Sequence, residues 1–92
     1  VVAPSDELME KTLSNMQEVA ARGGRIILIT DEEGARIAGH GVGDILVLPK
    51  VSNFVAPILA TIPVQLLAYH TATFMGTDVD QPRNLAKSVT VE

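Results

Sequence analysis

The sequence contains no cysteine and no tryptophan, and aromatic residues make up only 3% of its 92 positions. Without cysteine, the chain has no disulfide, no thiolate metal ligand and no cysteine nucleophile of its own. Basic residues are also few, because seven Lys and Arg stand against eleven Asp and Glu, which gives a net charge of −4. Nucleic-acid binding depends on clustered cations, so the composition argues against a nucleic-acid partner. The lack of cysteine fits a cytoplasmic protein.

Charged residues are absent from the long segment between Val51 and Thr77, which is long enough to cross a membrane. The segment nevertheless includes Gln65 and His70, and it has neither a basic cluster nor an aromatic belt at its ends. We therefore predict a helix from about residue 53 to residue 75 that protein surrounds on nearly all sides, with no membrane contact.

The remaining apolar residues predict one more helix and two strands. Helical spacing places the helix at about Ser5 to Arg22, with Gly23 supplying the left-handed residue that ends it. The β-branched runs at 26–30 and 45–48 show no alternation, which is typical of neighbouring parallel strands covered on both faces. The glycine-rich segment 31–44 is expected to be mostly a connection.

The order of these elements predicts the fold class. The opening residues Val1 to Pro4 resemble the end of a strand, so the chain reads as strand end, helix, strand, strand, helix and tail. Such alternation indicates an α/β protein, here part of a doubly wound, flavodoxin-like parallel sheet with flanking helices and an extended C-terminal tail. Because so few elements cannot cover both faces of a sheet, we expect other segments of the polypeptide or another subunit to complete it.

Several polar groups of the sequence lack the pattern of a binding or catalytic site. The spacing of glycines between Gly39 and Gly43 differs from that of a dinucleotide-binding loop. His40 and His70 lack a third nitrogen or sulfur ligand in an obvious pattern, so no metal site is expected, and His70 is expected to lie in a core. The acidic residues 31–33 follow a strand end, where ligands bind in parallel sheets, but a solvated loop is the favoured interpretation.

Two features of the C-terminal region remain. Asp78 and Asp80 are expected to turn the chain rather than to hold a cation. Lys87 is by composition an exposed charge, yet Leu85 and the neighbouring valines would help the tail to pack against a core. A lysine in an apolar pocket loses part of its preference for the charged form, so Lys87 could act as a Schiff-base nucleophile.

Two motifs carry a resemblance that spans essentially all 92 residues. The stretch IPVQLLAYH at 62–70 and the stretch GTDVDQPRNLAKSVTVE at 76–92 closely resemble the C-terminal end of the glutamine–fructose-6-phosphate aminotransferases (isomerizing). The segment APSDELMEKTLSNMQEVAARGG at 3–24 looks like the second sugar isomerase (SIS) domain of that family. The resemblance implies that residues 1–76 are the C-terminal portion of an SIS domain and that residues 77–92 are a tail with a catalytic lysine.

The resemblance also implies roles for residues of the tail. Lys87 looks like the lysine that forms a Schiff base with the ketone of open-chain fructose 6-phosphate. Ala86 looks like the position whose backbone contacts the sugar, and Asn84 and Val89 look like residues near the path of ammonia. The product would be glucosamine 6-phosphate, formed without a cofactor or a metal.

The implied partners are the rest of the same polypeptide, with its glutaminase and first SIS domain, and a second copy in a homodimer. The phosphate loop, the base and the ring-opening residue of the family match no position in this chain. The 92-residue chain alone is therefore expected to be inactive. The alternative is a non-catalytic SIS module that only binds a phosphosugar or dimerises, although Lys87 in its NLAKSVTVE setting favours the catalytic interpretation.

Overall fold

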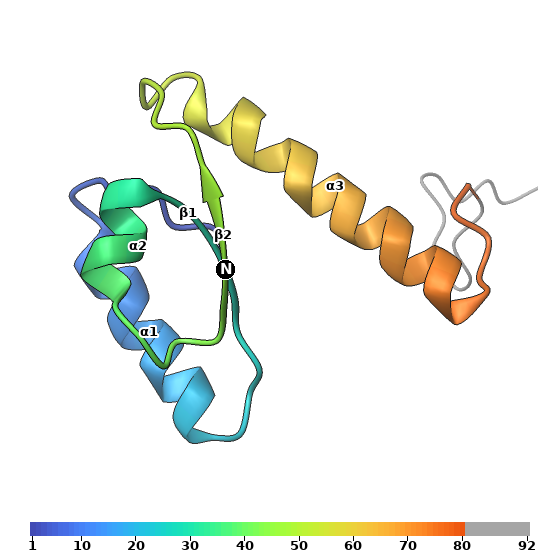
Figure 1. Cartoon of the computed structure of the whole chain (residues 1–92), viewed down its shortest axis with the longest axis horizontal. Helices are drawn as coiled ribbons and strands as arrows, with labels where there is room; N and C mark the ends of the chain where they lie inside the picture. Colours follow the sequence, from blue (N-terminus) through green and yellow to red (C-terminus); the bar gives the residue numbers. More distant parts are fainter. Residues whose placement is uncertain (81–92) are drawn as a thin grey trace, which may run out of the picture. The chain divides into compact units, whose positions relative to one another are not determined.

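The computed structural model describes residues 1–80, which form the elements α1 (Met9–Ala21), β1 (Ile27–Asp31), α2 (Glu32–Ala38), β2 (Asp44–Leu48) and α3 (Ala56–Met75) (Figure 1). These residues belong to two compact units, one of which ends at Thr61 while the other begins at Ile62. The α/β class predicted from the sequence is confirmed.

The strands β1 and β2 pair in parallel, with Ile27 beside Asp44 and Asp31 beside Leu48. The predicted pairing of these two runs is confirmed, with boundaries shifted by one residue. The N-terminal residues extend the same sheet, because Val2 forms a parallel bridge to Ile29. β1 therefore lies between the N-terminal segment and β2, as expected for a strand end that precedes α1.

Helix α1 begins later than the predicted Ser5. The Asp6 side chain accepts a hydrogen bond from the backbone N–H of Leu8 at 2.9 Å, and Ser5 bonds to Asp31 instead of capping the helix. Leu8 is the N-cap and provides no side-chain cap. The predicted end is confirmed, because Gly23 has φ +84° and its N–H donates to the carbonyl of Ala20.

The connection between the strands is more helical than expected. It contains the seven-residue helix α2, which begins directly after β1 and ends at Gly39, whose φ is +70°. A connection between parallel strands has to return the chain to the edge of the sheet where the first strand began. A helix can form this return while its backbone groups hydrogen-bond to one another. The glycine-rich remainder of the connection is a loop, as expected.

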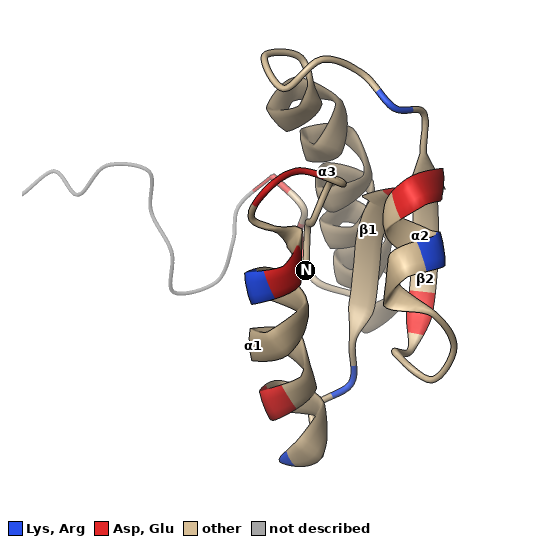
Figure 2. Ribbon diagram, turned by 90° about the vertical axis from the view of Figure 1, so that its left-hand side faces the viewer, with Lys and Arg blue, Asp and Glu red and all other residues tan. Residues whose placement is uncertain are grey.

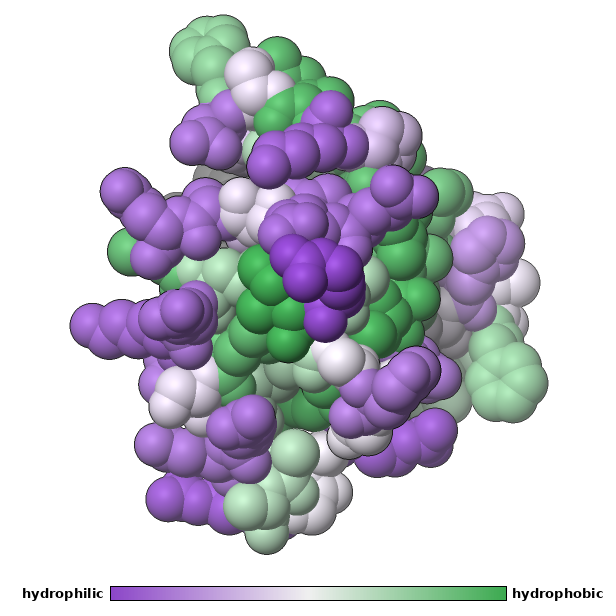
Figure 3. Space-filling model, turned by 60° about the vertical axis from the view of Figure 1, so that its left-hand side comes forward, coloured by the Kyte–Doolittle hydropathy of each residue, from purple (hydrophilic) through white to green (hydrophobic). Residues whose placement is uncertain are grey.

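The core of the first unit lies on one face of the sheet. Ala3, Met16, Ile26 and Leu28 form a buried cluster there, against which residues of α1, α2 and β2 pack. The opposite face is less covered, because Ile27 and Leu46 stay 41% and 44% exposed. Apolar side chains consequently reach the surface (Figure 3).

Helix α3 is uncharged, and it is uniformly tan in the charge view of Figure 2. Pro57 lies in its first turn and Gly76 ends it at φ +73°, both as predicted. Pro63 lies inside the helix and does not mark its start. The prediction of a helix surrounded by protein is wrong for the described part of the chain, where no residue of α3 is buried. Helix α3 alone among the described elements is long and apolar enough to cross a membrane, a criterion of length and composition that core helices also meet.

Candidate functional site

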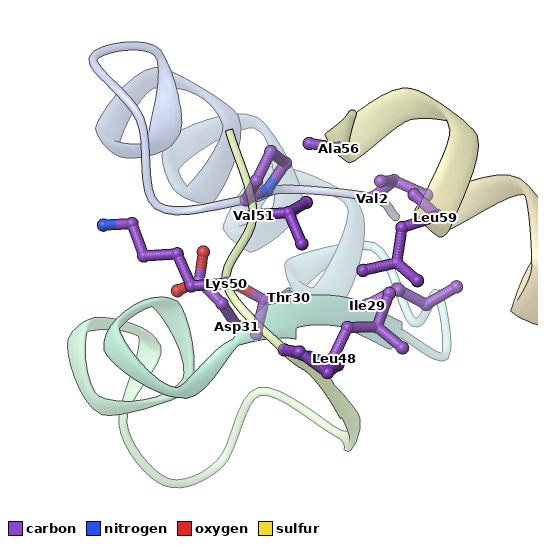
Figure 4. Close-up of a pocket in the computed structure, with 12 residues that line it drawn as sticks. Val2, Ile29, Thr30, Asp31, Leu48, Lys50, Val51, Ala56 and Leu59 are labelled. Atoms are coloured by element: carbon purple, nitrogen blue, oxygen red, sulfur yellow. The ribbon is translucent and has the colours of Figure 1, made fainter. Parts of the chain in front are cut away.

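A pocket lies at the carboxyl ends of β1 and β2, where ligands bind in parallel α/β sheets. Ile29, Leu48 and Leu59 supply apolar side chains, whereas Asp31 and Lys50 are its charged residues. In Figure 4 the ammonium end of Lys50 points away from the apolar side chains. The carboxylate of Asp31 is therefore the ionisable group whose chemistry matters most here.

Asp31 is held by three hydrogen bonds from two other segments of the chain. Its Oδ2 accepts hydrogen bonds from the backbone N–H of Ser5 at 2.9 Å and from the Ser5 hydroxyl at 2.8 Å. Its Oδ1 accepts from the backbone N–H of Gly34 at 2.8 Å, which caps helix α2. Asp31 is only 5% exposed, so the expectation of a solvated acidic loop is wrong for this residue. Glu32 and Glu33 are exposed, as that expectation requires.

The surroundings of Asp31 keep it ionised. Burial raises the pKa of its carboxyl, but the hydrogen bonds from Ser5 and Gly34 and the positive charge of Lys50 outweigh burial and hold the pKa below its ordinary value. A general acid or base needs a pKa near the working pH and an oxygen that can reach a substrate. The pKa of Asp31 is lowered instead, and its two oxygens already accept three hydrogen bonds, which tie β1, α2 and the segment before α1 together.

We expect the variant Asp31→Asn to lose about 1–3 kcal/mol of stability at neutral pH, since an amide cannot accept from all three donors without leaving a buried polar group unpaired. The folded-state pKa is depressed, so this contribution is fully present above the ordinary value of 3.8 and disappears as the pH falls through the lower folded-state pKa. Urea unfolding of both proteins at several pH values should therefore show a difference that shrinks below about pH 4. A difference of the same size at pH 7 and pH 3 would contradict the assignment.

The ion pair between Arg36 and Glu33 has no such role. Arg36 donates to Glu33 on the exposed side of α2, at i,i+3 spacing. Hydrogen bonding to Arg36, followed by its charge, lowers the pKa of Glu33, and the same contact raises that of Arg36. Exposed pairs of this kind contribute little to stability.

The pocket is too small to be a complete substrate site. Its volume is about 30 Å³, roughly the share of one water molecule in the liquid, whereas sites for small molecules enclose about 300–1,000 Å³. This pocket therefore does not by itself enclose a phosphosugar.

The residues that the sequence singles out fall into two groups. Lys87, Ala86, Asn84 and Val89 lie outside the described residues, and their roles stay predictions. His40 is exposed, and the prediction that His70 lies in a core is wrong, because within the described chain it is exposed and contacts the ring of Tyr69 edge-on at 5.4 Å. Among residues 1–80, no three His, Asp or Glu side chains are grouped to bind a metal.

The turn expected at the acidic pair after α3 is confirmed. The backbone N–H of Asp80 donates to the Asp78 side chain at 2.9 Å, which is the hydrogen bond of an Asx turn.

The sequence did not predict the hydrogen bonds that join Asp31 to Ser5 and Gly34. An aspartate that directly follows a buried strand and stands three residues before Gly34 has the spacing of an N-cap. Its second set of partners comes from Ser5, which is 26 residues away, and no local pattern indicates that pairing.

The described residues form part of an α/β domain with a parallel sheet. They leave one face of that sheet and the helix α3 largely exposed. No family model matches the chain. Its 92 residues are 67% identical to the glutamine–fructose-6-phosphate aminotransferase (isomerizing) of Brucella abortus, and equally to one of Rhizobium meliloti. The chain spans 15% of the length of each of these relatives.

A solved structure agrees with the sequence comparison. The C-terminal domain of glucosamine-fructose-6-phosphate aminotransferase from Francisella tularensis is 50% identical and superposes with a TM-score of 0.79. The match covers 87% of this chain and 22% of that one. The chain is therefore homologous to the C-terminal part of the glutamine–fructose-6-phosphate aminotransferases, which confirms the resemblance found in the sequence.

Proposed function

We propose that this chain is the C-terminal part of the isomerase region of an enzyme that makes glucosamine 6-phosphate from fructose 6-phosphate and the amide nitrogen of glutamine. The observation that carries the proposal is the 67% identity over all 92 residues to relatives whose name contains glutamine, fructose 6-phosphate and isomerisation. The sequence contains the stretch GTDVDQPRNLAKSVTVE, with Lys87 in it, which resembles the C-terminal end of that family.

The organisation that follows is an SIS portion over residues 1–76 and a tail over residues 77–92. Lys87 is the nucleophile in this proposal. Its neutral amine adds to the C2 ketone of open-chain fructose 6-phosphate, and loss of water leaves an imine. Ammonia then replaces the lysine at C2, and a proton moves from C1 to C2 as the C1 hydroxyl becomes an aldehyde. The net change consumes one ammonia and releases one water.

The residues beside Lys87 have supporting roles in this proposal. The backbone of Ala86 contacts the sugar, and Asn84 and Val89 lie beside the route of ammonia. A tail that covers the substrate also keeps out bulk water, which competes with ammonia for C2. The remaining catalytic groups come from other parts of the polypeptide, so we expect no turnover by the 92-residue chain alone. We assign the whole enzyme to the cytoplasm, as a homodimer.

Borohydride trapping tests the proposal directly. We expect that full-length protein mixed with fructose 6-phosphate and reduced with borohydride acquires one phosphosugar adduct, and that peptide mapping by mass spectrometry places it on Lys87. Lys11 and Lys50 are exposed lysines of the same chain and serve as internal controls for non-specific reductive alkylation.

An adduct that spreads evenly over the three lysines, or its absence from Lys87 under conditions of turnover, would refute the nucleophile assignment. Binding of fructose 6-phosphate without any adduct or turnover would instead favour a non-catalytic SIS module. Both outcomes are read from the same samples.

A further inference from the structure

The end of helix α3 is fixed by a Schellman motif. Gly76 has φ +73°, and its N–H donates to the carbonyl of Thr73 at 3.1 Å. The N–H of Thr77 donates to the carbonyl of Ala72 at 2.9 Å, which completes the two backbone hydrogen bonds of that motif. The Thr77 hydroxyl donates to the same carbonyl at 3.1 Å. These three hydrogen bonds set the direction in which the chain leaves the helix (Figure 1).

A second turn follows the Schellman motif directly. The backbone N–H of Asp80 donates to the Oδ1 atom of Asp78 at 2.9 Å, which closes an Asx turn. The segment 77–80 lines one groove together with the face of α3 that runs from Gln65 to Ala72. The chain therefore turns back beside the helix instead of continuing along its axis.

The two aspartates contribute different groups to this second turn. Asp78 supplies its side chain, whereas Asp80 supplies its backbone N–H. An alanine at position 80 keeps that N–H, but an alanine at position 78 removes the acceptor. An asparagine at position 78 keeps an acceptor oxygen and also forms Asx turns. The turn therefore depends on the side chain of Asp78 and not on that of Asp80.

The position of this turn in the sequence connects it to the chemistry of the tail. Lys87 follows Asp80 by seven residues. Seven residues span at most about 25 Å, so the place and direction in which the chain leaves residue 80 limit where the amine of Lys87 can go. Reacting atoms have to approach to about 3–3.5 Å, and a misplacement of about 1 Å can lower a rate by about a hundredfold.

We propose that Asp78 is a positioning residue for the step in which Lys87 forms an imine with the sugar. The inference rests on the proposed function, in which Lys87 is the nucleophile. Asp78 acts through the chain that links it to Lys87, because its turn fixes the start of that segment. Without the turn, the amine reaches C2 of the sugar less often, while the groups that bind the sugar are unchanged. The rate of imine formation should then fall, whereas the affinity for the sugar should not.

Rates of borohydride trapping in the full-length protein test this role. We expect Asp78→Ala to lower the rate of adduct formation on Lys87 at saturating fructose 6-phosphate by about tenfold. The sugar concentration that gives the half-maximal trapping rate should change by less than about twofold. Asp80→Ala is the matched control, because it removes the same charge two residues away and keeps the N–H that the turn needs. It is expected to trap the sugar at the wild-type rate.

Asp78→Asn separates the turn from the charge. It removes the carboxylate but keeps the acceptor, so it is expected to recover most of the rate that Asp78→Ala loses. Equal trapping rates for Asp78→Ala and the wild type, an equally slow Asp80→Ala variant, or no recovery in Asp78→Asn would each overturn the proposal and leave the proposed function standing. Absence of the adduct from Lys87 in the wild type would overturn both.

Discussion

Replacing Lys87 with alanine in the full-length protein is expected to abolish formation of glucosamine 6-phosphate while glutamine hydrolysis continues. Alanine has no amine, so the imine at C2 cannot form and the ketone remains the only acceptor for ammonia. Loss of a covalent nucleophile typically costs about a thousandfold or more in turnover. Separate assays for glutamate release and for amino-sugar formation measure the two activities in one preparation.

Two further variants separate nucleophilicity from charge. Lys87→Arg keeps the positive charge, but a guanidinium stays protonated and cannot form the imine, so this variant is expected to be as inactive as the alanine variant. Lys11→Ala removes an exposed lysine of α1 and is expected to change neither activity. Amino-sugar formation by the alanine or the arginine variant at more than a few per cent of the wild-type rate would contradict the role of Lys87 as the Schiff-base nucleophile.

The strands and helix ends were predictable because their causes are local. Apolar runs without alternation indicated β1 and β2 as parallel strands, and the short connection between them required adjacent positions in the sheet. The expected burial of both strands is wrong for β2, because the described residues leave all five of its residues at least partly exposed. Gly23 and Gly76 ended helices because a left-handed residue is needed there and glycine adopts that conformation at little cost. Each of these inferences depends on a few neighbouring residues.

The start of α1 and the role of Asp31 could not be predicted, because both depend on a contact between residues far apart in sequence. Ser5 has the chemistry of a helix cap, but its hydroxyl and N–H bond to Asp31 across 26 residues. Because of that contact, Ser5 does not cap α1, and the Asp6 side chain instead accepts from the backbone N–H of Leu8. The same contact buries the carboxylate of Asp31, which the sequence predicted to be solvated. Local propensity is a weak guide wherever tertiary hydrogen bonds compete with it.

The environment of α3 could not be predicted for a different reason. Its sequence indicates a helix that is buried all round, and the described residues do not bury it. An apolar pattern indicates that a helix is buried, but it does not indicate which segment of protein covers it. His70 illustrates the same limit, since its position on an apolar helix suggested a core residue and the described chain leaves it exposed.

Replacing Gly34 with alanine is expected to destabilise the junction of β1 and α2. The loss of stability should be larger than for an alanine substitution at any of the glycines that have open space around them. A Cβ at this position would collide with the Oγ1 atom of Thr30 and would lie 3.0 Å from the Cε atom of Met9. Thr30 cannot easily turn away, because it is buried and its hydroxyl donates to the carbonyl of Ala3 at 2.6 Å. Overpacking of this kind costs about 2–3 kcal/mol, which corresponds to a roughly hundredfold increase in local opening.

Hydrogen exchange of the peptides that span β1 and α2, measured in the full-length protein, reports this opening. Gly41→Ala is the matched control, because nothing lies near its Cβ position and only its φ of +88° is unfavourable, at a cost of about 1 kcal/mol. Adding Thr30→Ala to Gly34→Ala removes the colliding hydroxyl, so the pair should be less destabilised than the sum of the single variants by about 1 kcal/mol. Strict additivity would show that the collision is not the cause, because a contact that one change creates and the other removes makes the two effects depend on each other.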